Sequence, residues 1–198
     1  MTKLITFITA LALTSGLWAA TYTLDPSHSK IGFKIRHLGI SNVSGRFQKS
    51  SGTANYDDKT GKLSDIKVEI DAASIYTNEP DRDKHLKADD FFNVKVYPKI
   101  TFTSTKVTYK GKIPTKILGV LKILKTEQPI TLDIIDWGGT VVDPWGNHKM
   151  AFEAKGIIDR TKFGLKWNKG LKKVAGYVLG NEVKLIIEVE ANKVVKKK

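Results

Sequence analysis

Apolar and polar side chains alternate strictly between Ser29 and His37. Ile31, Phe33 and Ile35 lead to His37 along one side, while two lysines, an arginine and a glycine fill the positions between them. A period of two is typical of a β-strand with one face out of water and one face in solvent. The same alternation returns about seven times further along the chain, and little of the sequence in between resembles a helix.

About eight segments are predicted to be strands on this pattern. They are residues 27–38, 43–56, 66–71, 100–109, 117–123, 130–137, 150–156 and 183–190. A short helix is predicted over 81–88, because Pro80 suits a first turn and acidic residues follow it. Mostly antiparallel strands with one helical insert favour an all-β fold, a closed up-and-down barrel rather than a sandwich. Several strands reach roughly 30 Å, so the interior is deep enough for an elongated guest.

Glycines and one proline mark where strands bend or turn. Gly45 and Gly52 predict bulges or bends within the second strand, and Gly138-Gly139 predicts a bulge later in the chain. Asp143-Pro144-Trp145-Gly146 fits a type I turn, with proline second and glycine fourth.

The first twenty residues have the pattern of a secretory signal peptide. Lys3 precedes an apolar run, Leu4 to Leu17, that is too short to span a bilayer, and Ala19 and Ala20 suit a signal peptidase. We therefore expect residues 1–20 to be a signal peptide, residues 21–198 to form a single domain, and the mature protein to be periplasmic or secreted. An uncleaved membrane tether is the alternative.

The chain is strongly basic, with a formal net charge of +13, and it contains no cysteine. Packing rather than disulfides must therefore stabilise it. The lysines are spread over alternate strand positions, as expected of a solvated outer face. Since export removes the protein from most nucleic acid, we expect no nucleic-acid partner and instead transient contact with an anionic membrane surface.

Sequence motifs for catalysis or metal binding are missing. The four histidines do not stand at metal-ligand spacing, and no HExxH, CxxC or GxSxG motif occurs. We expect no catalytic residue, no metal and no cofactor. An enzyme remains the alternative, because carboxylates that are distant in sequence can meet in space.

Two polar residues close to the apolar strand faces allow two interpretations each. His37 either hydrogen-bonds the head of a ligand inside the barrel or is satisfied by backbone near a strand end. Arg46, beside Phe47, is either a group at the cavity mouth or a solvated surface arginine. The aromatic residues are core residues when taken singly, and only barrel geometry argues that together they line a pocket.

Several motifs resemble the YceI-like proteins, the polyisoprenoid-binding family. The opening of the family is similar to Asp25-Pro26-Ser27-His28-Ser29 leading into Ile31-Gly32-Phe33 and His37-Leu38. Its second strand, helix and return strand resemble Gly45-Arg46-Phe47, then Asp81-Arg82-Asp83, His85-Leu86, Phe91-Phe92 and Tyr97-Pro98. Later matches are Gly119-Val120-Leu121, Pro144-Trp145-Gly146 and Asp159-Arg160-Thr161-Lys162-Phe163-Gly164. The resemblance covers about Thr21 to Ala191.

The resemblance implies an extended lipocalin-like barrel, an exported location, a homodimer, and a role in stress or in isoprenoid quinone handling. It also implies an amphiphile in the cavity: an isoprenoid quinone precursor, a fatty acid or a fatty amide. One departure is Leu124-Lys125-Thr126, where the family pattern leads us to expect a glycine. We expect this to alter a turn or narrow one end of the barrel.

The sequence therefore predicts an exported protein that sequesters a long-chain amphiphile. The predicted tail contacts are Ile31, Phe33, Ile35, Phe47, Val68, Ile70, Phe102, Leu121, Phe152 and Trp167, and the predicted head contacts are His37 and Arg46. Two alternatives stay open. One is an enzyme acting on an isoprenoid or lipid in the same barrel, and the other is a protein that binds polyanions with its basic surface.

Overall fold

The computed structural model describes residues 19–168 and 177–195, so the predicted signal peptide lies almost entirely outside the described residues. The described elements are β1 (Ala20–Leu24), β2 (Lys30–His37), β3 (Ser41–Phe47), β4 (Ser50–Asp57), β5 (Lys62–Asp71), η1 (Ala72–Ser74), β6 (Ile75–Tyr76), α1 (Pro80–Leu86), β7 (Lys99–Lys110), β8 (Ile113–Ile123), β9 (Thr126–Val142), β10 (His148–Asp159), η2 (Arg160–Phe163) and β11 (Leu179–Lys193). None of the helices in these ranges has the length and apolar character needed to span a membrane.

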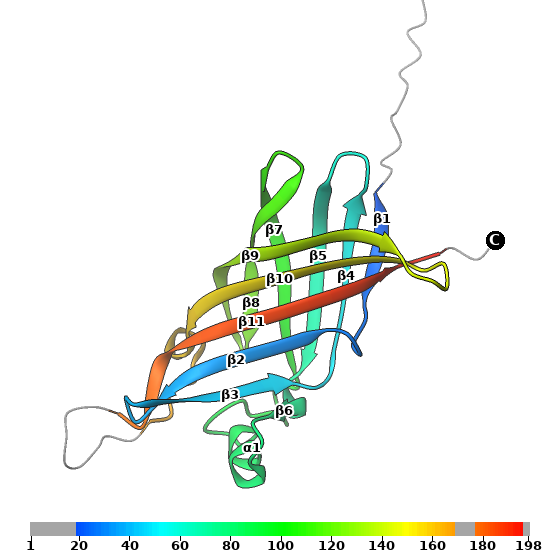
Figure 1. The fold of residues 1–198 in the computed structure, drawn as a ribbon. Coiled ribbons are helices and arrows are strands. Elements are labelled where there is room, and N and C mark those ends of the chain that lie inside the picture. Colours follow the sequence, from blue (N-terminus) through cyan, green and yellow to red (C-terminus); the bar gives the residue numbers. More distant parts are fainter. Residues whose placement is uncertain (1–18, 169–176, 196–198) are drawn as a thin grey trace, which may run out of the picture.

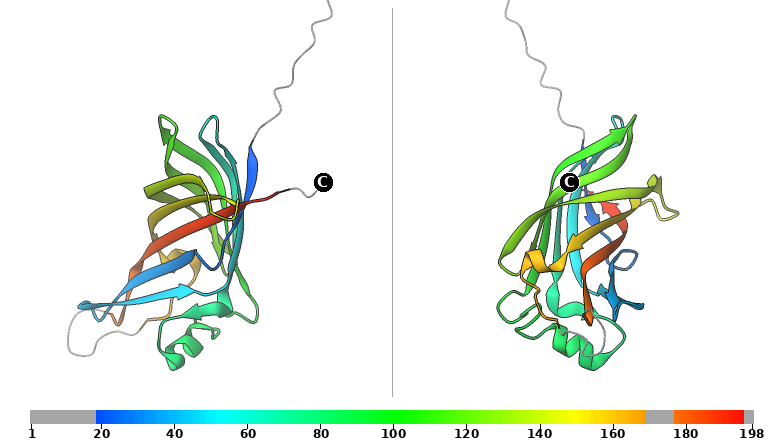
Figure 2. Two further views of the ribbon diagram at one scale, coloured as in Figure 1. Left: turned by 45° about the vertical axis from the view of Figure 1, so that its right-hand side comes forward. Right: turned by 90° about the vertical axis from the view of Figure 1, so that its left-hand side faces the viewer.

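Eight strands close into an antiparallel ring, in the order β1-β4-β5-β7-β8-β9-β10-β11, because β11 pairs back with β1. The predicted lipocalin-like barrel with a short helical insert is thereby confirmed. The remaining strands β2, β3 and β6 continue the sheet from β11. In Figure 1, β2 and β3 lie at the lower end of the barrel, near α1. Figure 2 shows α1 at the opposite end of the barrel from the start of β1.

The strand β11 makes this arrangement possible because it pairs with two different strands along one edge. Residues 191–193 pair with β1, and residues 179–188 pair with β2. The chain bends between β1 and β2, at the Asp25-Pro26 segment. The sequence pattern gave no sign of β1 as a separate strand, because its five residues are too few to show a clear alternation.

The second predicted strand, 43–56, is two strands in the structure, β3 and β4. The break falls at residues 48–49 and not at a glycine. The structure has no bulge at Gly45, because β2 and β3 keep one register throughout. Gly45 is instead a place of close approach, where a Cβ atom would lie 2.4 Å from Cζ of Phe33. Gly52 lies just before a register shift between β4 and β5.

The other local predictions are confirmed. The register of β9 against β10 shifts around Gly138, which makes the predicted bulge. The amide of Gly146 donates to the carbonyl of Asp143, which closes the predicted turn. The helix α1 begins at Pro80, and the Glu79 carboxylate caps it by accepting from the amides of Asp81 and Arg82.

Leu124 stands in the tight turn between β8 and β9, where Ile123 pairs with Thr126. Its φ of 55° lies in the left-handed region, which favours glycine. The side chain packs against the hydrophobic core. The leucine therefore keeps a backbone shape suited to glycine while it adds apolar surface at this end of the barrel.

Candidate ligand-binding cavity

A cavity of about 300 Å³ lies inside the barrel. This volume is at the lower end of the roughly 300–1,000 Å³ that is usual for ligand pockets. Strands β2, β3, β5 and β7 to β11 form most of its walls. The rest comes from β6, from α1 with its flanking residues, and from η2 with the segment that follows it. The walls are almost wholly apolar. Apart from the Trp167 indole, the lining side chains that can hydrogen-bond, among the described residues, are His37, Thr77, Arg82, His85 and Arg160.

The structure brings most of the residues predicted to contact a ligand to this cavity. Those that line it are Ile31, Phe33, Ile35, His37, Phe47, Val68, Ile70, Phe102, Leu121 and Trp167. They come from β2, β3, β5, β7 and β8 and from the segment after η2. Strand alternation explains the grouping, since the inward positions of β2 and β3 face those of β5, β7 and β8 across the interior.

Arg46 and Phe152 do not line the cavity. Arg46 is exposed, because its neighbour Phe47 faces the cavity and successive side chains of a strand point to opposite faces. Its guanidinium carbon lies 5.8 Å from the centre of the Tyr76 ring, so of the two interpretations the structure agrees with an arginine on the outer surface. Phe152 is buried and stacks on Trp137, with ring centres 6.1 Å apart, so it belongs to the packed part of the interior.

Four polar residues of the cavity, Thr77, Arg82, His85 and Arg160, were not among the predicted contacts, and Arg160 is the most deeply buried of them. It is only 2% exposed. Its Nε donates to the carbonyl of Gly180 at 2.8 Å, and its Nη1 donates to the carbonyls of Leu165 and of Trp167, the latter at 2.9 Å. Burial lowers the pKa of the guanidinium from its ordinary value, and Asp159 opposes that change. Alternate residues of a strand share a face, so the inward face that begins at Met150 continues along β10 to Arg160. This alternation was the feature of the sequence that could have identified Arg160 as a cavity residue.

The neighbouring Asp159 plays a local role. Its carboxylate accepts from the amide and the hydroxyl of Thr161 and caps η2. These hydrogen bonds hold the pKa of Asp159 below its usual range. Asp159 therefore stabilises the local turn, whereas Arg160 is buried and lines the cavity.

The helix α1 and its flanks supply three further polar groups. Arg82 donates from Nε to the hydroxyl of Thr77 and from Nη2 to the backbone carbonyl of Thr77, both at 2.7 Å. His85 lies 2.8 Å from a carboxylate oxygen of Asp90. Its ring packs edge-on against Trp167, with centres 5.3 Å apart.

Contacts connect these groups into one polar end of the cavity. His37 pairs with Leu179, which precedes the Gly180 carbonyl that Arg160 holds. Arg160 also holds the Trp167 carbonyl, and the ring of Trp167 meets His85. No carboxylate is found among the described residues that line the cavity. The site is therefore an apolar chamber with a polar, positively charged end, which suits an amphiphile.

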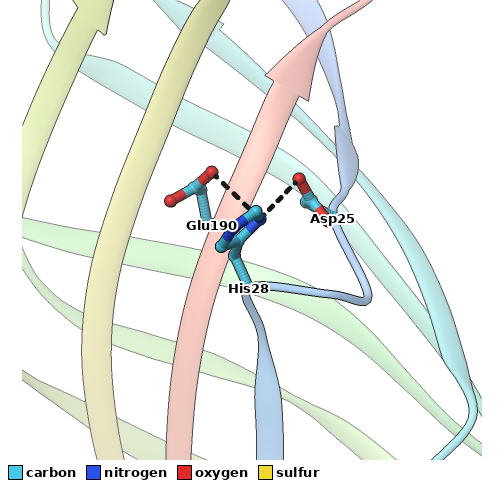
Figure 3. Close-up of side chains that lie close together, drawn as sticks. All are labelled: Asp25, His28 and Glu190. Carbon is cyan, nitrogen blue, oxygen red and sulfur yellow. Dashed lines mark hydrogen bonds and ion pairs between the residues drawn. The ribbon is translucent and has the colours of Figure 1, made fainter. Parts of the chain in front are cut away.

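A second cluster of polar side chains lies outside the cavity, where β1 bends into β2 (Figure 3). One ligand-type atom each of Asp25, His28 and Glu190 lies within 4.8 Å of the others. The ammonium of Lys149 forms ion pairs with both carboxylates, at 2.6 Å from Glu190 and 3.7 Å from Asp25. Hydrogen bonds, above all from the Ser27 hydroxyl, hold the pKa of Asp25 well below its usual range. This arrangement is a structural ion cluster at the bend.

Known proteins resemble this chain over nearly its whole described length. The sequence model of the YceI-like domain matches residues 22–191. Protein YceI of Escherichia coli O157:H7 is 36% identical over 190 residues, which cover 94% of each chain. The crystal structure of the Campylobacter jejuni YceI protein has a TM-score of 0.67 and 33% identity, and covers 88% of this chain and 98% of that one.

A polyisoprenoid binding domain from Saccharophagus degradans, implicated in plant cell wall breakdown, shares the fold, with a TM-score of 0.60 at 14% identity over 88% of this chain and 99% of that one. The family match and the identity to the E. coli protein together confirm the resemblance seen in the motifs. They show that the chain belongs to the family of YceI-like domains.

Proposed function

We propose that this protein binds a long-chain amphiphile in its barrel cavity and sequesters it. The ligand class is an isoprenoid quinone or polyisoprenoid, or a fatty acid or fatty amide. The observation that carries the proposal is the cavity itself, about 300 Å³ with apolar walls and one polar end. The related fold of a polyisoprenoid binding domain supports this choice of ligand.

The apolar tail supplies most of the affinity in this proposal. Each buried methylene contributes about 0.8 kcal/mol, so ten contribute roughly 8 kcal/mol before costs. Ordering the tail and losing free motion consume part of that. Micromolar affinity therefore needs a tail longer than about ten carbons, and short ligands bind poorly.

Binding rather than catalysis fits the chemistry of the polar end. Arg82 holds Thr77, and His85 meets Asp90. The hydroxyl of Thr77 donates to the carboxylate of Asp83 and accepts from Nε of Arg82, which ties it to the first turn of α1. A bound lipid is expected to be recovered unchanged after prolonged incubation, whereas an enzyme acting on a lipid in the same cavity would convert it.

Location and assembly are part of the proposal. We place the mature protein outside the cytoplasm, as a homodimer that contacts anionic membranes transiently and serves in stress response. The signal-like N-terminus supports the location, and the net charge of +13 supports the membrane contact. The homodimer and the stress role come from the family resemblance alone. N-terminal sequencing of the protein from cells, analytical ultracentrifugation and flotation with phosphatidylglycerol vesicles test the first three points. Survival of a deletion strain under stress tests the last.

The first experiment identifies what the protein carries. The protein is purified without denaturation and extracted into organic solvent, and the extract is analysed by mass spectrometry. A stoichiometric long-chain amphiphile supports the proposal and names the ligand class. An empty protein that also fails to bind added ubiquinone, oleamide and oleic acid would overturn it.

A further inference from the structure

The guanidinium of Arg160 has one nitrogen that no protein group satisfies. In the described part of the chain, buried side-chain polar atoms without a hydrogen-bond partner are the Nη2 of Arg160 and the hydroxyl of Tyr22. Nη2 carries two N–H donors, and its residue is 2% exposed. Leaving charged donors unpaired in the interior is costly, so such a group calls for an explanation.

The unsatisfied nitrogen cannot turn away to find another partner. The carbonyls of Gly180, Leu165 and Trp167 hold the other nitrogens of the same planar group. Because the guanidinium is rigid, these three hydrogen bonds also fix the direction of Nη2. Arg160 is one of the residues that line the cavity, and Nη2 is the buried nitrogen of this residue that has no hydrogen-bond partner.

The charges around the polar end favour a negative guest. Two arginines, Arg82 and Arg160, line the cavity, and no carboxylate does so among the described residues; Asp90 contacts His85 from outside the lining. The nearest acidic residue in sequence is Asp159. One of its carboxylate oxygens accepts hydrogen bonds from both the amide and the hydroxyl of Thr161. A buried positive charge without a facing carboxylate is stabilised when a ligand brings one negative oxygen within hydrogen-bond reach.

We propose that Arg160 binds the negatively charged head of the ligand, a carboxylate or a phosphate, through Nη2. The ligand then lies with its head at the α1 end of the cavity and its tail among the apolar strands. This inference rests on the proposed function, because it assigns an orientation and a head-group charge to the amphiphile.

The first test uses the unaltered protein and ligands that differ only in the head. Oleic acid is compared with oleamide and oleyl alcohol, and geranylgeranyl phosphate with geranylgeraniol, by displacement of a fluorescent fatty-chain probe at pH 7.5. The carboxylate or the phosphate is expected to bind about tenfold or more tightly than its neutral counterpart, as charged hydrogen bonds usually require. The two pairs distinguish a carboxylate guest from a phosphate guest.

The second test asks which residue causes the preference for a charged head group. Arg160→Gln is expected to bring the acid or phosphate down to the affinity of the alcohol, while the alcohol binds as before. Arg46→Gln is the matched control, because this arginine is exposed and does not line the cavity. Arg82→Gln removes the other arginine of the lining. Loss of the preference in Arg82→Gln but not in Arg160→Gln would overturn the assignment.

A crystal structure of the unaltered protein with geranylgeranyl phosphate or oleic acid keeps the assignment testable if Arg160→Gln does not fold. A head oxygen within hydrogen-bond distance of Nη2 supports the proposal, and a head elsewhere overturns it. Equal affinity for acid, amide and alcohol also overturns it but leaves the proposed function standing. Failure to bind any of these chains contradicts the proposed function itself.

Discussion

The ring of Phe33 occupies the space that a side chain at Gly45 would need. The two residues pair across β2 and β3, and a Cβ atom on Gly45 would lie 2.4 Å from Cζ of Phe33. Phe33 also lines the cavity. The absence of a side chain at this position of β3 therefore makes room for an aromatic ring of β2.

Gly45→Ala is expected to push the Phe33 ring into the cavity. Overpacking of this kind costs about 1–3 kcal/mol of stability, and the displaced ring takes room from a bound tail. Urea unfolding measures the first effect, and affinity for a series of fatty acids of increasing length measures the second. Ser44→Ala, on the exposed neighbour in the same strand, should change neither. Unchanged binding in Gly45→Ala would show that the ring moves elsewhere.

Val183→Phe is expected to shorten the longest tail that the protein binds. Val183 lines the cavity from β11, and a phenyl ring there fills part of the chamber. Val189→Phe is the matched control, because Val189 is on the same strand face and packs against the core outside the cavity lining. Both variants lose about 1–3 kcal/mol of stability through overpacking. A chain-length series that shifts equally in both would contradict the position assigned to the tail.

Tyr22→Phe is expected to leave stability at pH 7 unchanged or higher and to reduce its loss at alkaline pH. Tyr22 is 0% exposed, and its hydroxyl has no partner in the described structure. Burial first, then Asp58 and Tyr56, raise the pKa of Tyr22 from 10.0 to about 12.

The direction of the pH effect follows from this raised pKa. Because the folded protein keeps the Tyr22 proton more tightly than the unfolded chain, stability is full below pH 10 and falls as the pH rises toward 12. The loss from this one group is at most about 3 kcal/mol. Urea unfolding at pH 7, 9 and 11 compares the two proteins. A parallel alkaline loss in the variant would assign the effect to other tyrosines, such as Tyr56, whose pKa is also raised.

Asp25→Asn is expected to destabilise the protein at pH 7 by about 1 kcal/mol, through loss of charge-assisted hydrogen bonds at the bend. The Asp25 carboxylate accepts from Ser27 and Asn192 and lies 3.1 Å from the His28 ring. Since folding lowers the pKa of Asp25, its contribution is present above about pH 4 and is lost as the pH falls below that value.

The check for Asp25→Asn is urea unfolding between pH 2.5 and pH 7. The difference between the two proteins should shrink at the acidic end. Asp65→Asn is the control, because this carboxylate has a lowered pKa but lies on the exposed surface, away from the bend. A difference that persists unchanged at low pH would mean that shape rather than charge at position 25 stabilises the bend.

The inward faces of strands, the bulges and the start of the helix could be predicted from the sequence because they are local properties. The alternation in residues 29–37 gives the inward face of β2, and Gly138 gives the bulge of β9. Pro80 with its following acids gives α1. Each depends on a few adjacent residues and on backbone geometry that needs no distant partner.

The candidate site could be predicted in part, and its errors have physical reasons. Arg46 and Phe47 are neighbours in one strand, so they cannot both face the cavity, and Phe47 does. Phe152 is on the inner face of β10, as predicted, but alternation says nothing about depth along the barrel. Arg160 continues that same inner face and reaches the cavity.

The sequence by itself determined which residues face inward, the all-β class, the helical insert and the family. Only the tertiary structure decided that β11 pairs with both β1 and β2, and that Phe152 packs against Trp137 while Phe102 borders open space. It alone showed that three backbone carbonyls hold Arg160 and leave one nitrogen free. The reason is that alternation fixes the side of a strand, whereas the depth of a cavity and the partners of a buried charge depend on how distant segments close around each other.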